Sequence, residues 1–364
     1  MANKKNNLNL IDVKYTKLAY EQALINLGST AINPSVGCVV VKNNSVISSG
    51  HTSFNGRPHA ENNALKKKIN FKDSNLYVSL EPCSHYGKTP PCTDLIIKKK
   101  IKRVVFSITD SDPRSKKKAE RKLRNSKIIV KKHILKNYAK QFYQSYFLQS
   151  TNQLPLVDAK LAISKDSYTK NKKERWITNI ESRRLGNFIR SKYDCLLTTS
   201  KTINDDNPYL DCRIEGLEKK TPDLVIMDRF LKTKINSNIF KKKNRKILIF
   251  TQSNNKIKEN IFKKKGIKII KVLQNDNINS NFTNMFHSIK KLGYSRILIE
   301  SGITFLSKLL QLNIIKNFYL FKSSKNLSTK GYKKFSLFPI KYKYFKKNKI
   351  KVNLKEDKLY MMKL

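Results

Sequence analysis

The sequence lacks the features that would place it in a membrane or outside the cell. None of its apolar runs reaches the roughly 18 residues that a membrane-spanning helix needs. The polar N-terminus has no apolar stretch of the kind that secretion signals contain. The five cysteines are odd in number and unevenly spread, at Cys38, Cys83, Cys92, Cys195 and Cys212. Together these absences predict reduced thiols and a cytoplasmic location.

Acidic residues are also scarce, with 26 Asp and Glu against 76 Lys and Arg, for a formal net charge of +50. A basic chain can indicate nucleic-acid binding. Here, however, lysines are spread over the whole length, arginine is comparatively rare, and aromatic residues do not alternate with a basic stripe. Because Lys, Asn and Ile share A/T-rich codons, genomic base composition explains the excess more simply. We therefore expect neither a nucleic-acid nor a membrane partner, but a basic surface that attracts phosphorylated small molecules.

The 364 residues are enough for about two domains. A polar segment ending at Pro155 places the boundary between residues 150 and 151, which gives domains 1–150 and 151–364. Strands alternate with helices on both sides of this boundary, as in α/β folds. In the first domain we expect helices at 15–27, 60–68, 92–99, 116–124 and 134–149, and strands at 36–41, 46–49, 76–80, 104–108 and 128–130. In the second we expect strands at 156–162, 195–199, 224–227, 246–250, 267–272 and 297–299, helices at 180–190, 286–292 and 305–312, and late strands within 342–364.

Two short motifs carry the chemistry of the first domain. His59-Ala60-Glu61 comes first, and a segment from Glu81 to Cys92 follows it with a cysteine at position 83. One imidazole and two thiolates can hold zinc and leave a fourth position open for water, whose pKa zinc lowers toward neutrality. Glu61 can move protons without binding the metal. An H-x-E motif followed by Pro-Cys is the signature of zinc nucleobase deaminases.

Two other interpretations of these residues stay open. A structural zinc would need a fourth protein ligand, and His85 is the obvious candidate, although it is equally well placed to line a substrate pocket. Cys38, Cys195 and Cys212 have no such context and are expected to be ordinary buried thiols. Eight residues separate Cys83 from Cys92, more than in the P-C-x-x-C signature of generic deaminases. The longer insert indicates a separate branch of that superfamily.

Over nearly its full length the chain resembles the family of bifunctional deaminase/reductases of riboflavin biosynthesis. The resemblance depends on ordered segments in both halves, of which the segment from Glu81 to Cys92 is the most specific. The segments are 33–38, 56–61 and 81–92 in the first half, and 160–166, 176–178, 202–208 and 300–302 in the second.

The resemblance implies a cytidine-deaminase-like three-layer first domain and a dihydrofolate-reductase-like second domain. The first would deaminate 2,5-diamino-6-(5-phosphoribosylamino)pyrimidinone, and the second would reduce the ribosyl group of the product to ribityl with NADPH. By the same resemblance, His59, Cys83 and Cys92 bind one zinc ion per chain, and Glu61 is the catalytic proton shuttle. The residues that fall at NADPH-binding positions are Ala162, Trp176, Thr202, Asp206 and the segment from Gly302 onward. Those that fall at substrate-binding positions are Lys160, Arg190, Leu210, Arg213 and Glu300.

The residue types in the second half agree with such a site, but each has a plainer interpretation. Arginine offers a planar fork for a phosphate or a pyrimidine edge. Glu300 follows a predicted strand, where side chains often line a ligand crevice, yet it is also an ordinary loop carboxylate. Trp176 is the only tryptophan, and it serves equally well as a packing residue. Asp205 and Asp206 are also typical turn or cap residues.

The sequence departs from the family pattern at several places. Ser167 stands where the family usually has glycine, and Glu174 where it commonly has a serine that contacts substrate. A basic segment, 114–118, replaces a glycine-rich one, and 321–334 lacks the expected small residues. Two alternatives follow: a deaminase with a degenerate reductase domain, and, from the charge, a deaminase that acts on tRNA. The sequence leaves open whether the chain forms a homo-oligomer.

Overall fold

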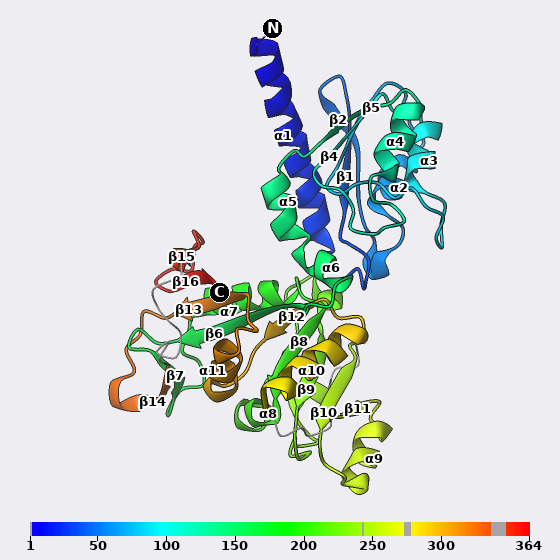
Figure 1. Ribbon diagram of the computed structural model, residues 1–364. Helices are drawn as coiled ribbons and strands as arrows, with labels where there is room; N and C mark the ends of the chain where they lie inside the picture. Colours follow the sequence, from blue (N-terminus) through cyan, green and yellow to red (C-terminus); the bar gives the residue numbers. More distant parts are fainter. Residues whose placement is uncertain (1, 242–243, 273–277, 336–346) are drawn as a thin grey trace. The chain divides into compact units, whose positions relative to one another are not determined.

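The computed structural model describes residues 2–241, 244–272, 278–335 and 347–364, and the side chains of residues 2–8, 278–280 and 347 are not described (Figure 1). The chain divides into two compact units, Met1–Asn152 and Gln153–Leu364. This division lies two residues beyond the boundary expected from the sequence. Each unit has its own sheet and its own core.

The first unit is built on a five-stranded sheet with the order β2-β1-β3-β4-β5. Strand β1 pairs antiparallel with β2 and β3, whereas β3, β4 and β5 run parallel. The strands are β1 (Gly37–Lys42), β2 (Ser45–His51), β3 (Asn75–Val78), β4 (Arg103–Phe106) and β5 (Ile129–Lys132). The helices are α1 (Ala2–Ile25), α2 (Ala60–Leu65), α3 (Cys92–Lys98), α4 (Lys118–Asn125), α5 (Lys136–Phe142) and α6 (Gln144–Gln149), with a short 3-10 turn at Phe54–Gly56.

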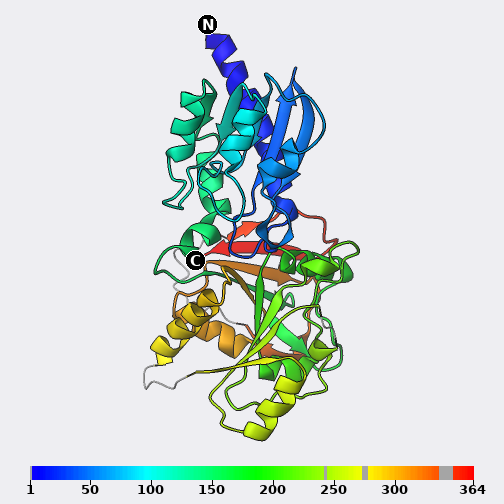
Figure 2. The same ribbon diagram turned by 90° about the vertical axis from the view of Figure 1, so that its right-hand side faces the viewer.

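Helices cover both faces of this sheet, which gives the three layers that were expected. Along β1, Val39 and Val41 pack in one cluster with Tyr15 and Ala19 of α1, while the alternate residue Val40 belongs to the cluster on the α2 side. This alternation follows from the two-residue period of a strand. Figures 1 and 2 show α1 and α5 on one side of the sheet and α2, α3 and α4 on the other.

Two predicted helices of this unit differ from the structure. The helix predicted at 15–27 begins far earlier, as α1 extends from Ala2 to Ile25. The single helix predicted at 134–149 is wrong, because the chain breaks at Tyr143 between α5 and α6. The Tyr143 hydroxyl lies 2.6 Å from Ser79 Oγ in the core, so a tertiary contact holds the residue at which the helix is interrupted.

The second unit contains a nine-stranded sheet with the order β11-β10-β9-β8-β12-β6-β13-β16-β15. All neighbours from β11 to β13 are parallel, and only β16 and β15 at one edge are antiparallel. The strands are β6 (Leu156–Ile163), β8 (Cys195–Thr199), β9 (Asp223–Met227), β10 (Ile247–Thr251), β11 (Lys268–Lys271), β12 (Arg296–Ile299), β13 (Asn317–Lys322), β15 (Lys347–Lys349) and β16 (Lys358–Lys363). A separate two-stranded ribbon pairs β7 (Tyr168–Asn171) with β14 (Gly331–Lys334).

The helices of this unit lie in the connections between the parallel strands, which a tight turn cannot join. They are α7 (Ile180–Arg190), α8 (Ser200–Asp206), α9 (Lys256–Lys264), α10 (Ile278–Lys291) and α11 (Ile303–Gln311), with 3-10 turns at Glu218–Lys220, Asn238–Phe240 and Ser328–Lys330. The predictions of α7 and β8 are confirmed to the residue, whereas α8, α9, β7, β13 and β14 were not predicted. The helix predicted at 286–292 begins at Ile278. Of the predicted late strands, β15 and β16 are present, and residues 342–346 lie outside the described part.

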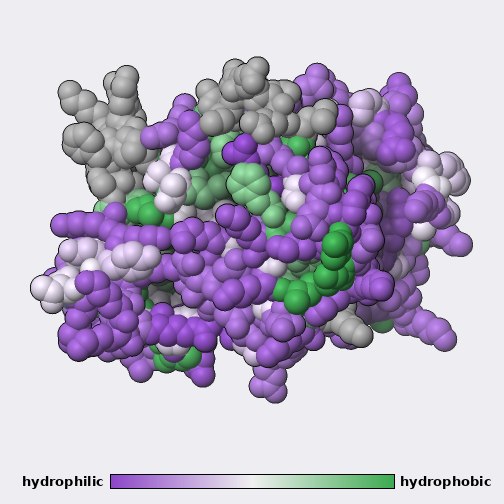
Figure 3. Space-filling model, turned by 90° about the horizontal axis from the view of Figure 1, so that it is seen from below, coloured by the Kyte–Doolittle hydropathy of each residue, from purple (hydrophilic) through white to green (hydrophobic). Residues whose placement is uncertain are grey.

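Two features of the described surface follow from composition. No described helix combines the length and the apolar content that a membrane crossing demands. On the face shown in Figure 3, hydrophilic side chains cover most of the surface and apolar ones appear in small separate groups.

Candidate active sites

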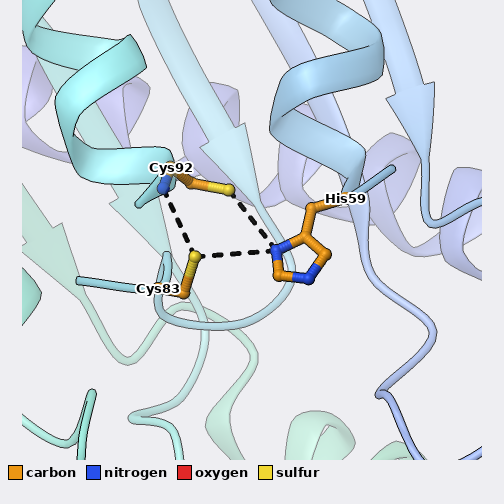
Figure 4. A group of neighbouring side chains, drawn as sticks. All are labelled: His59, Cys83 and Cys92. Carbon is orange, nitrogen blue, oxygen red and sulfur yellow. Dashed lines mark hydrogen bonds between the residues drawn. The ribbon is translucent and has the colours of Figure 1, made fainter. Parts of the chain in front are cut away.

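Three elements of the first unit bring His59, Cys83 and Cys92 together. His59 is the N-terminal cap residue of α2, Cys83 lies in the loop after β3, and Cys92 is the first residue of α3. Their ligand atoms all lie within 4.8 Å of one another. In Figure 4 the imidazole Nδ1 faces both sulfurs, at 3.6 Å from Cys83 Sγ and 3.5 Å from Cys92 Sγ.

These distances fit a tetrahedral metal. Ligands at the Zn–N and Zn–S bond lengths, about 2.0–2.1 Å and 2.3 Å, lie about 3.6 Å apart when the angle between them is tetrahedral. Both N···S separations match this value, so the imidazole and each sulfur are spaced as zinc ligands would be. Three protein ligands leave a fourth tetrahedral position for a non-protein ligand, which is the pattern of catalytic zinc sites.

The two thiols differ in acidity. A hydrogen bond from the Cys92 thiol, helped by His59, lowers the pKa of Cys83 to about 4 against the opposing effect of burial. The same hydrogen bond and burial raise the pKa of Cys92 well above its usual value. The backbone N–H of Cys92 also donates to Cys83 Sγ at 3.3 Å. The lowered pKa of Cys83 favours its thiolate, which is the form that binds zinc.

Glu61 lies in the first turn of α2 beside this group. Its side chain is buried, and burial raises its pKa to about 7, with a further contribution from the negative charge of Cys83. A carboxyl group with a pKa near neutrality can both accept and return a proton. Since Glu61 does not belong to the three-residue ligand group, it is available for that task.

His85 has a different partner. Its Nδ1 lies 2.7 Å from Ser115 Oγ, and His85 is not in the ligand group. The structural-zinc interpretation, which needs His85 as fourth ligand, therefore has no support among the described residues. Ser115 belongs to the basic segment 114–118. Glu81 also contacts this segment, because its carboxylate accepts a hydrogen bond from the N–H of Lys117 at 3.2 Å.

The second unit has a cavity of about 1860 Å³. It lies at the ends of several parallel strands, where α/β folds usually bind ligands. All ten residues predicted for the second half line it: Lys160, Ala162, Trp176, Arg190, Thr202, Asp206, Leu210, Arg213, Glu300 and Gly302. Elements that are far apart in sequence therefore bring the predicted cofactor and substrate positions to one place.

A buried ion cluster forms one wall of the cavity. Arg190, at the end of α7, donates from Nε and a terminal nitrogen to Glu300 at 2.5 and 2.9 Å, and Lys160 Nζ of β6 lies 3.5 Å from the same carboxylate. Burial opposes ionisation, but Arg190 and Lys160 outweigh it and hold the pKa of Glu300 at about 2. This decides against an ordinary loop carboxylate, because Glu300 is a buried anion between two cations.

Gly302 and Thr202 form another part of the lining. Gly302 caps α11, and its N–H donates to Thr202 Oγ1 at 3.1 Å. A side chain at position 302 would meet nothing closer than that oxygen, at 4.0 Å, so the helix start is open to the cavity. An open helix N-terminus with exposed N–H groups suits the pyrophosphate of a dinucleotide.

The contacts of Trp176 and Asp206 test whether these are only a packing residue and a turn residue. Trp176 is 47% exposed and its ring lies between the guanidinium groups of Arg175 and Arg183, at 5.0 and 4.8 Å. A half-exposed ring that lines a cavity is poorly explained by core packing alone. Asp206 ends α8 and accepts from Lys170 Nζ at 2.8 Å, so its carboxylate is paired across the cavity mouth.

The departures from the family pattern have local explanations. Ser167 adopts a positive φ of 73°, a conformation that glycine reaches at lower cost, and its backbone bonds to Ser164 and Phe335 hold it there. Glu174 lines the cavity, but it is 62% exposed and lies 3.6 Å from Lys325 Nζ, so its charge is hydrated and paired. Within 321–334, Phe321 lies on β13 beside β6, and its ring lies 5.6 Å from Lys160 Nζ.

The sequence interpretation missed several lining residues. On α7, Arg183, Gly186 and Asn187 line the cavity beside Arg190, which was predicted. Their spacing of three, four and seven residues marks one face of a helix, and this signal was present in the sequence. Ser115 had no such signal, because its contact with His85 depends on two loops meeting.

Comparisons with known proteins agree with this geometry. The family model for the cytidine and deoxycytidylate deaminase zinc-binding region matches residues 11–108, and that for the RibD C-terminal domain matches residues 155–328. The riboflavin biosynthesis protein RibD of Aquifex aeolicus is 35% identical over 67% of this chain and 69% of its own. That of Buchnera aphidicola is 31% identical over 87% of this chain and 88% of its own.

The chain belongs to the RibD family. Solved structures agree over both units. A deaminase/reductase of Thermotoga maritima matches with a TM-score of 0.80 at 28% identity, and RibD of Acinetobacter baumannii with 0.81 at 25%; each comparison covers 98% of this chain and 99% of the other. The two-part α/β fold, the place in riboflavin biosynthesis, and the pairing of a deaminase with a reductase are thereby confirmed, as are zinc and NADPH as the cofactors of the two activities.

Proposed function

We propose that the first unit hydrolyses an amino group from 2,5-diamino-6-(5-phosphoribosylamino)pyrimidinone, and that the second reduces the ribosyl group of the product to a ribityl chain. The observation that carries the first step is the His59, Cys83 and Cys92 group with buried Glu61 beside it. The observation that carries the second is the single cavity in which all ten predicted residues meet.

In the deamination, zinc held by His59, Cys83 and Cys92 would make a water acidic enough to attack a ring carbon at neutral pH. Glu61 takes a proton from the attacking water and gives it to the departing nitrogen. The water oxygen bonds to the carbon, the carbon–nitrogen bond breaks, and ammonia leaves. His85, whose Nδ1 lies 2.7 Å from Ser115 Oγ, would contact the pyrimidine.

In the reduction, NADPH would supply a hydride to the sugar carbon that bears the amino substituent. Ala162, Trp176, Thr202, Asp206 and the segment from Gly302 onward bind the nucleotide, while Leu210, Arg213 and Arg190 bind the substrate. Lys160 donates a proton to the sugar oxygen as the ring opens. Glu300 holds Lys160 and Arg190 in place, because its carboxylate is paired with both.

One substitution separates the two activities. Glu61→Gln should abolish deamination, because the amide cannot accept and return a proton, while zinc content and reduction of supplied deaminated intermediate stay as in the wild type. The measurement is ammonia release, zinc content and NADPH oxidation on one sample. Deamination retained in this variant would contradict the role of Glu61.

The alternatives predict different results in the same assay. A degenerate reductase domain would release ammonia from the substrate without consuming NADPH. Against this alternative stands the cavity itself, which all ten predicted residues line. A deaminase acting on tRNA would bind tRNA with a steep salt dependence. The relatives favour small-molecule chemistry, and the cytoplasmic location stays a prediction.

A further inference from the structure

Residues 209–213 contribute three cavity-lining side chains from an irregular segment after α8. Tyr209, Leu210 and Arg213 line the cavity. Leu210 has a φ of 53°, in the left-handed region that a branched side chain rarely adopts. A conformation of this kind persists only when surrounding contacts hold it.

Two guanidinium groups supply those contacts to three consecutive carbonyl oxygens. Arg245, just before β10, donates to the carbonyls of Tyr209 at 2.8 Å and Leu210 at 2.5 Å. Arg190 donates to the next carbonyl, that of Asp211, at 2.9 Å. Arg190 also binds Glu300 and so belongs to the site, whereas Arg245 does not line the cavity.

The segment in turn sets the place of Arg213. The Arg213 Nε lies 3.2 Å from the buried carboxylate of Asp211, and its guanidinium lies 5.6 Å from the centre of the Tyr209 ring. A shift of the backbone at 209–211 would therefore move both Arg213 and Leu210. Burial lowers the pKa of Arg245 only to about 10, so the group remains a charged double donor at neutral pH.

We propose that Arg245 is a positioning residue of the reductase site, which holds the backbone of residues 209–211 so that Leu210 and Arg213 face the substrate. This inference rests on the proposed function of the second unit. Without Arg245 the segment spends only part of its time in the binding conformation, and apparent affinity falls by that fraction. Turnover of bound substrate is affected much less, because the reacting groups are elsewhere.

The test is Arg245→Met, with Arg245→Lys as the conservative variant. The KM for the deaminated intermediate should rise roughly tenfold or more in Arg245→Met, with kcat changed less than about threefold. Arg245→Lys should recover part of the loss, since one ammonium can still donate to one carbonyl. Ammonia release by the first unit and NADPH binding, followed through the fluorescence of Trp176, should stay as in the wild type.

Lys258→Met is the matched control. Lys258 Nζ donates to the carbonyl of Leu231 at 3.2 Å, and Leu231 also has a positive φ, of 51°, but neither residue lines the cavity. The KM of Lys258→Met for the deaminated intermediate should equal that of the wild type. An unchanged KM in Arg245→Met, or an equal rise in Lys258→Met, would overturn the inference.

The same variants also test the inference if Arg245→Met does not fold, or if the wild type does not carry out the proposed reduction. If Arg245→Met fails to fold, Arg245→Lys decides: a raised KM with an unchanged unfolding midpoint supports the inference, and an unchanged KM overturns it. If the wild type binds the deaminated intermediate without oxidising NADPH, the proposed reduction is wrong. The inference is then decided by the dissociation constant of that intermediate, which Arg245→Met should raise and Lys258→Met should not.

Discussion

Replacing Glu300 by glutamine tests the ion cluster of the reductase cavity most directly. The change keeps the shape of the side chain and removes one negative charge. Arg190 and Lys160 would then face each other across a neutral amide, and Arg190 would remain a buried cation without its anion. Removing one partner of a buried ion pair is strongly destabilising because the other charge stays uncompensated.

The pKa of Glu300 gives the expected size. A fall from 4.5 to about 2 corresponds to roughly 3 kcal/mol of preference for the ionised form in the folded chain. Because the folded pKa is the lower one, this stabilisation is complete above the ordinary pKa of 4.5 and is lost as pH falls through about 2. Glu300→Gln should therefore lower the free energy of unfolding by about 3 kcal/mol at pH 7. The difference from the wild type should shrink below pH 4.5.

Urea unfolding followed by tryptophan fluorescence measures this in the second unit alone, since Trp176 is the only tryptophan. With a slope of about 2–3 kcal/mol/M, the unfolding midpoint should fall by roughly 1 M or more. Glu174→Gln is the control, because the Glu174–Lys325 pair is exposed and contributes at most about 1 kcal/mol. A midpoint for Glu300→Gln no lower than that of the control would refute the reasoning.

Three predictions concern the first unit. Cys92→Ser should reduce zinc content and deamination while NADPH oxidation on supplied intermediate persists; loss of both activities together would contradict separate sites. Gly37→Ala should lower the free energy of unfolding of this unit by at least about 3 kcal/mol, or prevent its folding, because a Cβ there would lie 1.8 Å from the Ala19 carbonyl oxygen of α1. Zinc release as a function of urea concentration measures this change. A stability like that of the wild type would show that α1 does not pack so closely. In the same assay, Asp12→Asn should lower the free energy of unfolding by about 3 kcal/mol, since buried Asp12 accepts from Arg103 at 2.7 and 2.8 Å and from Lys131 at 2.7 Å. A decrease below about 1 kcal/mol would show that these ion pairs contribute no more than ordinary surface pairs.

Local pattern was enough for much of the fold. The apolar runs at β1, β3 and β8 and the amphipathic spacing of α7 predicted these elements close to their bounds, because their residues bury one face or both. Where an element depends on contacts with distant parts of the chain, its prediction was wrong or was not made. Tyr143, where a continuous helical pattern is interrupted, contacts Ser79 through its hydroxyl, far away in the sequence. Strand β13 was not predicted, although its aromatic residues pair with β6.

The sequence by itself was enough to propose His59, Cys83 and Cys92 as zinc ligands and Glu61 as the proton shuttle, because ligand type and short spacing are local properties of the chain. Through resemblance, it also predicted ten site residues of the second half, all of which line one cavity. Only the tertiary structure decided how these residues work together: that Glu300 is an ion between Arg190 and Lys160, and that His85 pairs with Ser115. The hydrogen bond from Arg245 to the carbonyl of Leu210 likewise depends on the fold. The reason is physical, since each of these contacts joins residues from different elements, and no local pattern records which loops and strand ends a fold will bring within hydrogen-bonding distance.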